Sequence, residues 1–410
     1  MTPARITGLA LLSPAGRTVE ANVGAWRAGR AAGADAGLDP PLDRVPLARL
    51  PDSDELRAAE ARWGDRAAAL GVLAAGDALA SAGLDDAWMR RDRSALVVGT
   101  SKAGVLTALT AADAVRSGDR DRAARAAANL WPWGTPGGPC AALLRRYHPG
   151  GPIHTVVAAC ATGLAALAQG AAVVADGRAD TAVVVATDAS IHPLFIGAFR
   201  TMGALARWDE VPADACRPFS ADREGFVLSE GAAAIVLQAP RVCGQPGNPT
   251  APVVTVAGAA VGSQGGHLVR PNASAAALAD VIRLARARAG WADDPVALIH
   301  AHGTGTPAGD RAETAAIRRA LGTAADRVVV VSTKPVTGHL LGAAGLAQAV
   351  LTVRAMQTHL IPPAVNYRRR DPACDLDYNT DGPRRTAVTR ALCLANGFGG
   401  ASATVALATA

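Results

Sequence analysis

Short runs of β-branched residues recur along the chain and alternate with stretches in which Ala and Leu repeat with a helical period. The runs predict buried strands at Ala95–Gly99, His154–Ala158, Thr181–Ala186, Ala233–Leu237, Val253–Val256, Val296–His300 and Arg327–Val331. The helical stretches are Thr162–Ala175, Ala273–Ala289, Thr314–Leu321 and Ala344–Met356. Because alternating strands and helices need crossover connections, the pattern predicts an α/β fold with mainly parallel sheets covered on both faces.

Two distant segments share one plan: a Val-rich strand, a tight turn, and a TG pair that opens a helix of small residues. They are Thr155–Val174 and Val328–Val350. Two-fold duplication explains the match, with two central helices lying close together between sheets, and coincidence in an Ala-rich chain is the alternative. The Pro- and Gly-rich stretch Pro240–Pro252 is the candidate boundary between an N-terminal half, 1–245, and a C-terminal half, 246–410.

The composition supports a large buried core. Of the 410 residues, 50% are hydrophobic and 19% are charged, which excludes a disordered chain or a small disulfide-stapled domain. Aromatic residues make up only 4%, too few for a platform that stacks single-stranded nucleic acid. The net charge of +6 is modest and the arginines are scattered, which argues against a nucleic-acid partner and allows an acidic protein partner.

Cysteine spacing and apolar run lengths bear on location. None of the six cysteines falls in a metal-ligand spacing, so a reduced cytoplasmic protein fits best. The apolar stretch near the start is about five residues long, too short for the core of a signal peptide. No run reaches the roughly 18 apolar residues of a membrane span, so we expect a soluble protein without a membrane partner.

Cys160 has the setting of a nucleophile. It follows a predicted strand and directly precedes a predicted helix, in the sequence VVAACATGLAAL. A thiol there points at free N–H groups and the positive end of the helix dipole, which favours the reactive thiolate. The same N–H groups can stabilise an oxyanion on an attached acyl group. The alternative is a buried inert thiol, and no other cysteine has this setting.

Two histidines follow predicted strand ends in the second half. His302 lies in ALIHAHGTGTPAGDRAE and His339 lies in VSTKPVTGHLLGAAG. Two neutral imidazoles facing a thioester can donate hydrogen bonds to a developing enolate, which a decarboxylating Claisen condensation requires. Metal ligation is the competing interpretation. No third ligand recurs at a suitable spacing, and Asp310 and Glu313 fit helix N-terminal positions better.

A lysine, two hydroxyls and a glycine-rich turn complete the candidate set. Lys334 is one of only two lysines in an Arg-rich chain, which indicates a compact ammonium beside an imidazole, with chance survival as the alternative. Thr304 and Thr306 share the loop of His302. The NGFGG turn at 396–400 can bring a backbone N–H close to a ligand, whereas a phosphate cradle is disfavoured because no GK[ST] follows.

Five motifs, taken in order, resemble one family. They are AACATG around Cys160, DREGFVLSEGA from Asp222, HAHGTGTPAGDRAE from His300, STKPVTGHLLGAAG from Ser332 and NGFGG from Asn396. Over nearly its whole length the chain resembles the type II β-ketoacyl-ACP synthases. The resemblance implies a thiolase-like α/β fold, in which two pseudo-duplicated βαβαβαββ halves stack in five layers, α-β-α-β-α, within a dimer.

The resemblance also implies roles for the catalytic residues. Cys160 would accept the acyl chain from an acyl carrier protein. His302 and His339 would hold the carbonyl of a malonyl thioester and promote loss of carbon dioxide, and the carbanion would attack the acyl-Cys160 thioester. Lys334 would tune the histidine pair electrostatically. The N–H groups of Cys160 and Phe398 would form the oxyanion hole.

Substrate contacts and partners follow from the same resemblance. Phe199 would gate the acyl pocket, and Glu313 would be structural. The implied substrate-binding residues are Thr304, Thr306, Phe199, Lys102, Phe226 and Gly399. Substrates would arrive on the phosphopantetheine of an acyl carrier protein, with Thr304 and Thr306 positioning that arm, and no metal or redox cofactor is implied.

The expected partners are an acidic carrier protein and a second subunit. An acidic partner needs a basic surface near the entrance, and the candidates for it are Arg200, Arg207 and Arg270. A homodimer is expected, and a heterodimer stays open.

The chain departs from the family pattern around the acyl pocket. The glycine-rich turn with an apolar residue at the tunnel floor is here Gly99–Gly104, with Lys102 at the floor. A buried ammonium without a partner costs about 3 to 5 kcal/mol, so we expect a short primer or one with a polar or acidic distal end. Pairing of Lys102 with a carboxylate across the dimer interface is the alternative. Differences at Gln264–Pro271, Asn396 and residues 131–133 also indicate a specialised pathway.

Three functions follow from these observations. The first is a β-ketoacyl-ACP synthase of polyketide-type biosynthesis. The second is a ketosynthase-like acyltransferase or cyclase that holds a carrier-bound chain on Cys160. The third is a non-catalytic partner subunit of a heterodimer, in which the nucleophile is typically replaced. A thiolase would need a cysteine base in the C-terminal half, and neither Cys374 nor Cys393 sits in a CGGG turn.

Overall fold

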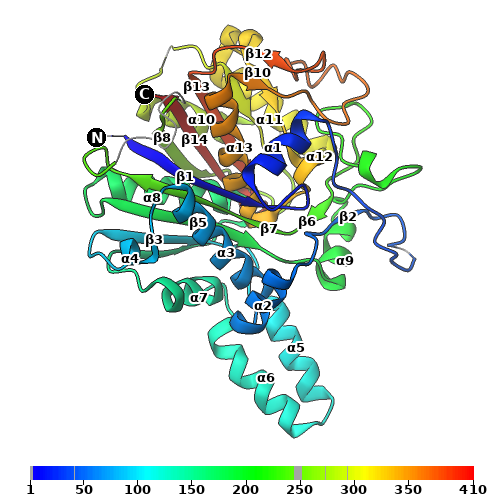
Figure 1. Ribbon diagram of the computed structural model, residues 1–410. Coiled ribbons are helices and arrows are strands. Elements are labelled where there is room, and N and C mark those ends of the chain that lie inside the picture. The colour runs from blue at the N-terminus through cyan, green and yellow to red at the C-terminus, as the bar shows by residue number, and fades with distance from the viewer. Residues whose placement is uncertain (1–2, 41, 244–251, 273, 293) are drawn as a thin grey trace.

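The computed structural model describes residues 3–40, 42–243, 252–272, 274–292 and 294–410 (Figure 1). The strands are β1 (Ala4–Leu12), β2 (Leu47–Ala48), β3 (Ser94–Gly99), β4 (Ile153–Val156), β5 (Thr181–Asp188), β6 (Leu228–Ser229), β7 (Gly231–Gln238), β8 (Val254–Ser263), β9 (Leu298–His300), β10 (Val329–Val331), β11 (Leu360–Ile361), β12 (Arg384–Arg385), β13 (Arg390–Asn396) and β14 (Ala401–Thr409). The α-helices are α1 (Val19–Arg27), α2 (Asp54–Trp63), α3 (Arg66–Ser81), α4 (Asp86–Met89), α5 (Val105–Arg116), α6 (Arg120–Trp133), α7 (Gly138–Tyr147), α8 (Thr162–Ala175), α9 (Pro193–Thr201), α10 (Ala276–Arg288), α11 (Pro307–Leu321), α12 (Lys334–Thr337) and α13 (Ala344–Thr358). Short 3-10 turns are η1 (Ala159–Ala161), η2 (Pro212–Asp214), η3 (Gly322–Arg327), η4 (Leu341–Ala343) and η5 (Phe398–Gly400).

Ten strands form one sheet in the order β10-β9-β13-β14-β8-β1-β7-β5-β3-β4. If the sheet is divided between β8 and β1, the two halves have the same strand order. With the strands of each half numbered along the chain, the order from the outer edge inward is third, second, fourth, fifth and first. The directions also repeat. In both halves the fifth strand pairs antiparallel with the first and the fourth, and the second pairs parallel with the third and the fourth. The duplication that the sequence repeat predicts is therefore confirmed.

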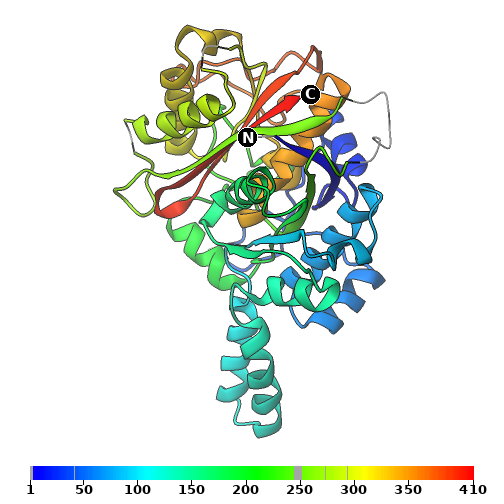
Figure 2. The same cartoon turned by 90° about the vertical axis from the view of Figure 1, so that its left-hand side faces the viewer.

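The sheet doubles back on itself to give the expected five layers (Figures 1 and 2). Helices α3 and α7 cover the outer face of the N-terminal strands, and α10 and α11 cover the outer face of the C-terminal strands. Helices α8 and α13 lie between the two sets of strands and contact each other. The two sets join where β1 pairs with β8, through Ala4 with Val256 and Arg5 with Thr255.

Glycines allow the two central helices to cross closely. A Cβ built on Gly163 of α8 would lie 2.5 Å from the backbone nitrogen of Leu346, and one on Gly345 of α13 would lie 2.9 Å from that of Leu164. Real Cβ atoms do not approach backbone this closely, so only glycine fits at either position. The small residues expected in these two helices thus have a packing reason.

Some element boundaries differ from those predicted. Helix α8 has the predicted limits, but α11 begins at Pro307 rather than Thr314, because Thr306 occupies the N-cap position and proline is favoured in the first turn. The predicted start of α10 at Ala273 and most of the stretch Pro240–Pro252 lie outside the described residues, so the boundary between 1–245 and 246–410 stays a prediction.

Helices α5 and α6 form a hairpin that projects from the body (Figures 1 and 2). Val115 on this hairpin is 63% exposed. At its base, Trp133 is buried against Gly64 in the core beside α3. Within the part of the chain that the structure describes, no helix is both long and apolar enough to cross a membrane.

Candidate active site

Cys160 lies in a tight turn between the sheet and a central helix. Strand β4 ends at Val156, Cys160 is the middle residue of η1, and α8 begins at Thr162. The prediction that a buried strand leads to Cys160 is wrong, because β4 is an edge strand and Ile153 is 44% exposed. Ala159 has a φ of +47°, which is strained for a residue with a Cβ. This turn holds the thiol at the N-terminal end of α8.

The Cys160 side chain is buried in an apolar cluster and is 6% exposed. The aromatic members of the cluster include Phe199, Phe226 and Phe398. Burial raises the pKa of the Cys160 thiol above its ordinary value, while the ammonium groups of Lys102 and Lys334 lower it. The nucleophile therefore lies in a dry site with two nearby cations.

The two predicted histidines face each other beside this cluster. Their ring centroids lie 5.5 Å apart in an edge-to-face arrangement, and the ring of Phe226 lies 4.8 Å from that of His339. The Nδ1 atom of His339 accepts a hydrogen bond from Leu341 N at 3.3 Å, so the proton of the neutral ring sits on Nε2. Burial, and then the charge of Lys334, lower the pKa of both His302 and His339 well below 6.5, so both rings are neutral near pH 7.

Lys334 and Glu313 hold the loop that carries His302. The Nζ atom of Lys334 donates to the carbonyl oxygen of His302. The Glu313 carboxylate accepts from His302 N at 2.6 Å and Gly303 N at 2.8 Å. Burial lowers the pKa of Lys334 to about 8 and raises that of Glu313 to about 7. Glu313 thus holds the backbone of the loop, and the Lys334 charge lies next to the histidine pair.

Gln348 belongs to the same site and was missed from the sequence. Its Oε1 lies 3.4 Å from Lys334 Nζ, and its Nε2 donates to the carbonyl oxygen of Ala301 at 2.6 Å. The side chain thus ties α13 to the loop after β9 and orients the ammonium. The available signal was a lone amide in the otherwise apolar first turns of a central helix.

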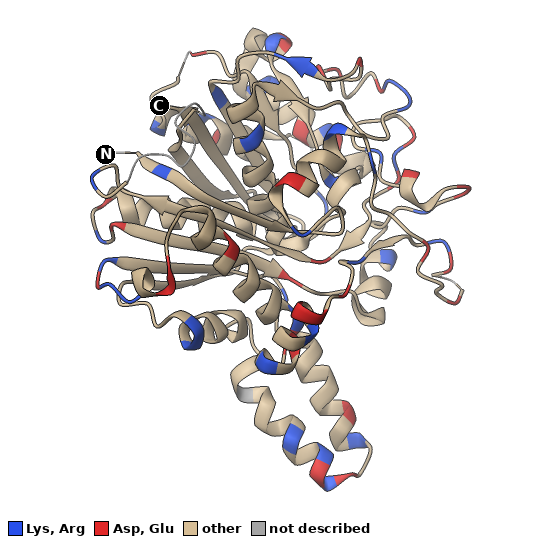
Figure 3. Ribbon diagram, viewed as in Figure 1, with Lys and Arg blue, Asp and Glu red and all other residues tan. Residues whose placement is uncertain are grey.

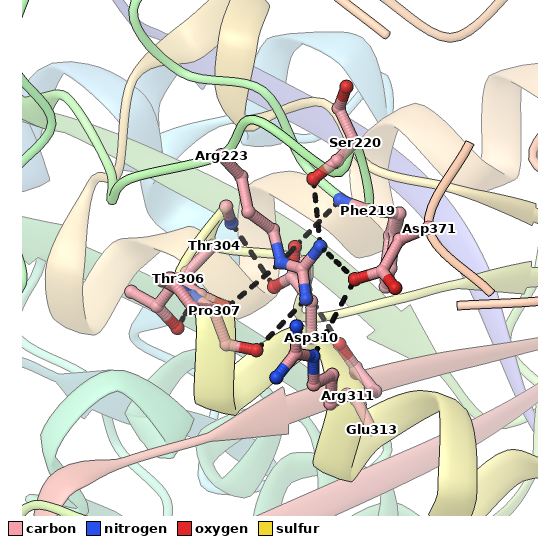
Figure 4. Close-up of polar contacts among 12 residues, drawn as sticks. Phe219, Ser220, Arg223, Thr304, Thr306, Pro307, Asp310, Arg311, Glu313 and Asp371 are labelled. Carbon is pink, nitrogen blue, oxygen red and sulfur yellow. Dashed lines mark hydrogen bonds and ion pairs between the residues drawn. The ribbon is translucent and has the colours of Figure 1, made fainter. Parts of the chain in front are cut away.

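Arg223 and Asp310 form a buried ion network behind the HGTGT loop (Figure 4). The Arg223 guanidinium donates to the carbonyl oxygens of Thr306 and Pro307, at 3.3 and 2.9 Å, and to Asp371 Oδ2 at 2.7 Å. The side chain therefore clamps together the DREGF run, the start of α11 and the loop of Asp371. The motif was recognised in the sequence, but this role of its arginine was not.

Asp310 fixes two neighbouring backbone segments (Figure 4). Its carboxylate accepts from Phe219 N at 2.7 Å and Gly305 N at 3.2 Å. Burial raises its pKa to about 6. The hydroxyls of Thr304 and Thr306 lie 3.0 Å apart on the loop that Asp310 supports, so the structure brings both predicted pantetheine contacts together.

The glycine-rich turn η5 packs directly against the Cys160 turn. A Cβ on Gly397 would lie 3.1 Å from Cys160 N and 2.8 Å from the carbonyl oxygen of Ala158, so glycine is needed for this approach. In the turn, the N–H groups of Gly397, Gly399 and Gly400 donate to Ala401, Leu268 and Gly397 respectively. The N–H groups of Cys160 and Phe398 have no hydrogen-bond acceptor among the described residues.

A cavity of about 50 Å³ adjoins His302, and its lining includes Gln264, Thr304 and Asn396. The Nδ1 atom of His302 is buried and has no hydrogen-bond partner in the described part of the chain. Two of the predicted departures from the family pattern are joined here, because Gln264 donates to the hydroxyl of Ser402, which donates in turn to Asn396. The cavity lies beside the predicted pantetheine contact Thr304.

The predicted residues at the periphery are placed as follows. Lys102 Nζ lies 5.5 Å from the centre of the Phe199 ring, and Phe199 also contacts Phe226 and Phe398. Arg207 and Arg270 are exposed, Arg200 is half-buried at the end of α9, and basic and acidic residues are interspersed over the surface (Figure 3).

Comparison with protein families gives two matches. Residues 48–241 match the N-terminal domain of β-ketoacyl synthases, and residues 253–368 match the C-terminal domain. The chain is 34% identical to the ketoacyl synthase alpha subunit of the tetracenomycin polyketide synthase of Streptomyces glaucescens, over 98% of this chain and 96% of that one. It is also 34% identical to the 3-oxoacyl-[acyl-carrier-protein] synthase 2 of Coxiella burnetii, over 64% of this chain and 63% of that one.

Solved structures agree with the fold. A β-ketoacyl synthase from Burkholderia phymatum superimposes with a TM-score of 0.87 at 26% identity, and the ishigamide ketosynthase/chain length factor does so with the same two values. Both alignments cover the whole of each chain. The thiolase-like architecture is confirmed, and the chain belongs to the β-ketoacyl synthase family, the acyltransferase-type condensing enzymes of polyketide and fatty-acid synthesis.

Proposed function

We propose that this chain catalyses decarboxylative Claisen condensation between an acyl group held on Cys160 and a malonyl group on an acyl carrier protein. One observation carries the proposal. A buried thiol, two neutral imidazoles and two backbone N–H groups that have no acceptor in the described part of the chain lie together in one site. Each of the three has a distinct task in that reaction.

The first half-reaction loads the enzyme. The Cys160 sulfur attacks the carbonyl carbon of the acyl thioester, the bond from that carbon to the pantetheine sulfur breaks, and the pantetheine thiol leaves with a proton. The negative oxygen of the tetrahedral intermediate accepts hydrogen bonds from the N–H groups of Cys160 and Phe398. The Cys160 N–H lies at the N-terminus of α8, and both donors lie in a dry site, where such bonds stabilise the transition state most.

The second half-reaction forms the carbon–carbon bond. His302 and His339 donate hydrogen bonds to the carbonyl oxygen of the malonyl thioester, with His339 donating from Nε2. The bond between the malonyl α-carbon and the carboxylate breaks, and carbon dioxide leaves. The electron pair of that bond stays with the thioester and forms an enolate, which both imidazoles stabilise. The enolate carbon attacks the acyl-Cys160 carbonyl, and the Cys160 thiolate is expelled. Burial, and then the charge of Lys334, keep both histidines neutral.

Carrier protein and cofactor follow from the same chemistry. Thr304 and Thr306, beside the small cavity at His302, would line the path of the phosphopantetheine arm, and Gly399 and Phe226 would border it. The thioesters on this arm are the substrates, and we propose no further cofactor. A relative in fold, at 24% identity and a TM-score of 0.90, was solved as a ketosynthase in complex with a type II polyketide synthase acyl-carrier protein. For this chain, Arg200, Arg207 and Arg270 are the proposed basic contacts.

We also propose that the chain works as a dimer. Strand β4 lies at the edge of the sheet, where Ile153 within the strand is 44% exposed and Val157 directly after it is 55% exposed. A second copy would cover this edge and the projecting hairpin. A homodimer is the expected form, and a heterodimer with a related subunit is the alternative. The six cysteines are free thiols, in agreement with a cytoplasmic enzyme.

The departures around the acyl pocket support a specialised, polyketide-type pathway. Lys102 replaces an apolar residue at the pocket floor and contacts the Phe199 ring. An ammonium there disfavours a long alkyl chain, so the proposed primer is short or polar.

Intact mass measurement of the purified protein tests the proposal. The protein is exposed to acyl-carrier-protein thioesters of graded length and polarity, and then to malonyl-carrier protein, with Cys160→Ala as control. We expect acyl loading that is lost in Cys160→Ala, followed by an extended product and carbon dioxide. Loading without extension would replace condensation by acyl transfer or cyclisation, and absence of loading would point to a non-catalytic subunit.

A further inference from the structure

Lys102 places a cation within reach of the acyl group. It follows β3, and its ammonium lies 5.5 Å from the centre of the Phe199 ring, a member of the apolar cluster that buries Cys160. Its charge acts on Cys160 and on His339. An acyl group that extends from the Cys160 sulfur past Phe199 would bring its far end to this ammonium.

The ammonium is only partly satisfied by the protein. A lysine has three N–H donors, and one of them donates to Ser101 Oγ at 3.1 Å. Within the described residues Lys102 forms no ion pair with a carboxylate. The cation–π contact with the Phe199 ring is attractive, but the ring does not supply the oxygen acceptors that a carboxylate would supply. At least one donor thus has no acceptor among the described residues.

The buried carboxylate next to this site is not available to Lys102. Asp188 Oδ2 accepts from Ser101 N at 3.0 Å, Ser101 Oγ at 2.5 Å and Gly342 N at 2.9 Å, and Oδ1 accepts from Ser190 Oγ at 3.0 Å. The single hydroxyl proton of Ser101 is used in this way, so Ser101 can only accept from Lys102. Lys102 is thus held through Ser101, and the described part of the chain supplies no countercharge to its ammonium.

We propose that Lys102 binds a carboxylate at the distal end of the acyl group loaded on Cys160, so that the primer is a short dicarboxylic acyl thioester. The inference rests on the proposed function and names its substrate class. A carboxylate supplies both the countercharge and the acceptors that the ammonium lacks, whereas an alkyl end would remove water from the cation and return nothing. Loading is otherwise unchanged: the Cys160 sulfur gains the acyl carbon, and pantetheine leaves as the thiol.

The test compares primers that differ only in charge. Succinyl-carrier protein and 4-oxopentanoyl-carrier protein have the same shape, with a methyl group in place of one carboxylate oxygen. We expect the full-length protein to load succinyl at least tenfold faster, measured as the rate of mass gain at Cys160. In Lys102→Met the ratio of the two rates falls by at least tenfold, and in Lys102→Arg the preference for succinyl persists. Arg283→Met, on the exposed face of α10, keeps the original ratio and is the matched control.

Each other outcome overturns the inference in a recognisable way. Equal loading of both primers by the unaltered protein would contradict it while leaving the proposed function intact. An equal slowing of both primers in Lys102→Met would mean that Lys102 acts on the Cys160 thiol and not on the substrate. If neither primer nor any neutral acyl group is loaded although iodoacetamide still alkylates Cys160, the proposed function fails, and the inference fails with it.

Discussion

The two halves of the molecule build the same turn and use it differently. Each central helix is preceded by a 3-10 turn, η1 before α8 and η4 before α13, and each turn starts with a residue at positive φ, Ala159 at +47° and Leu341 at +52°. The middle residue is Cys160 in the first half and Gly342 in the second. Gly342 N donates to the Asp188 carboxylate, whereas Cys160 N has no acceptor among the described residues.

This difference teaches how a duplicated fold acquires a single active site. Both turns aim backbone N–H groups into the centre of the molecule, which suits them for anions. In the second half an internal carboxylate occupies the position, and a Cβ on Gly342 would lie 2.7 Å from Asp188 Oδ2. In the first half the same position carries the thiol, and in the proposed reaction it receives the substrate oxyanion. The backbone provides the geometry twice, and the side chains decide which copy reacts.

The largest expected effect is at the crossing of the central helices. Gly163→Val and Gly345→Val should each lower the free energy of unfolding by about 3 kcal/mol or more, because the new side chain meets backbone that cannot move cheaply. Urea denaturation of both variants measures this loss. Gly24→Ala in α1, where nothing lies within 4 Å of the new Cβ, is the control and should be neutral or slightly stabilising. If only one of the two valine variants loses stability, the two halves do not constrain the helix crossing equally.

The next effect separates chemistry from stability. Gly342→Ala should lower the free energy of unfolding by about 2 kcal/mol, because Asp188 and the Ser101 backbone must shift. Cys160→Ala should abolish acyl loading and change stability by less than about 1 kcal/mol. Chemical denaturation and intact mass, applied to both variants, give the comparison. A stable Gly342→Ala that also loads normally would show that the second turn is not held by Asp188.

The pKa values of the histidine pair allow the contributions of Lys334 and Lys102 to be ranked. Burial lowers the pKa of His302 and His339 first, and the Lys334 charge lowers both further and also lowers that of Glu313. Removing this charge in Lys334→Met therefore raises all three pKa values. The acid limb of the pH profile for carbon dioxide release from malonyl-carrier protein should move to higher pH.

Lys102→Met supplies the matched comparison for that experiment. The Lys102 charge also lowers the pKa of His339, but less than that of Lys334 does. The acid limb of the pH profile of Lys102→Met should also move to higher pH, by a smaller amount than in Lys334→Met. An unmoved limb in Lys334→Met would mean that the ammonium does not set the charge of the pair.

The smallest effect concerns backbone strain in the first turn. Ala159→Gly should raise the free energy of unfolding by about 1 kcal/mol, because glycine adopts positive φ without a Cβ clash. Ala168→Gly in the middle of α8, where φ is helical, should lower it by a similar amount and is the control. Equal destabilisation by both would show that Ala159 is not strained.

The sequence predicted those features that depend on interactions between residues close together in the chain. The limits of α8 follow from its own apolar period, and the five motifs place the residues that the site brings together. The exposed edge position of β4 could not be predicted, because it depends on which strands pair at a distance. The same applies to Arg223 and Gln348, whose importance comes from contacts with segments far away in the chain. The earlier start of α11 was available from Thr306 and Pro307 as an N-cap followed by proline.

The pairing of β1 with β7 has a consequence for synthesis on the ribosome. Strand β1 ends at Leu12 and its partner begins at Gly231, so roughly 220 residues must be made before the first strand finds its neighbour. At about 5 to 20 residues per second, the apolar N-terminal strand waits roughly 10 to 45 s. Strand β8 waits in the same way for β14, at the very end of the chain. Each half therefore closes only with its last strand, and the nascent chain should depend on chaperones during both intervals.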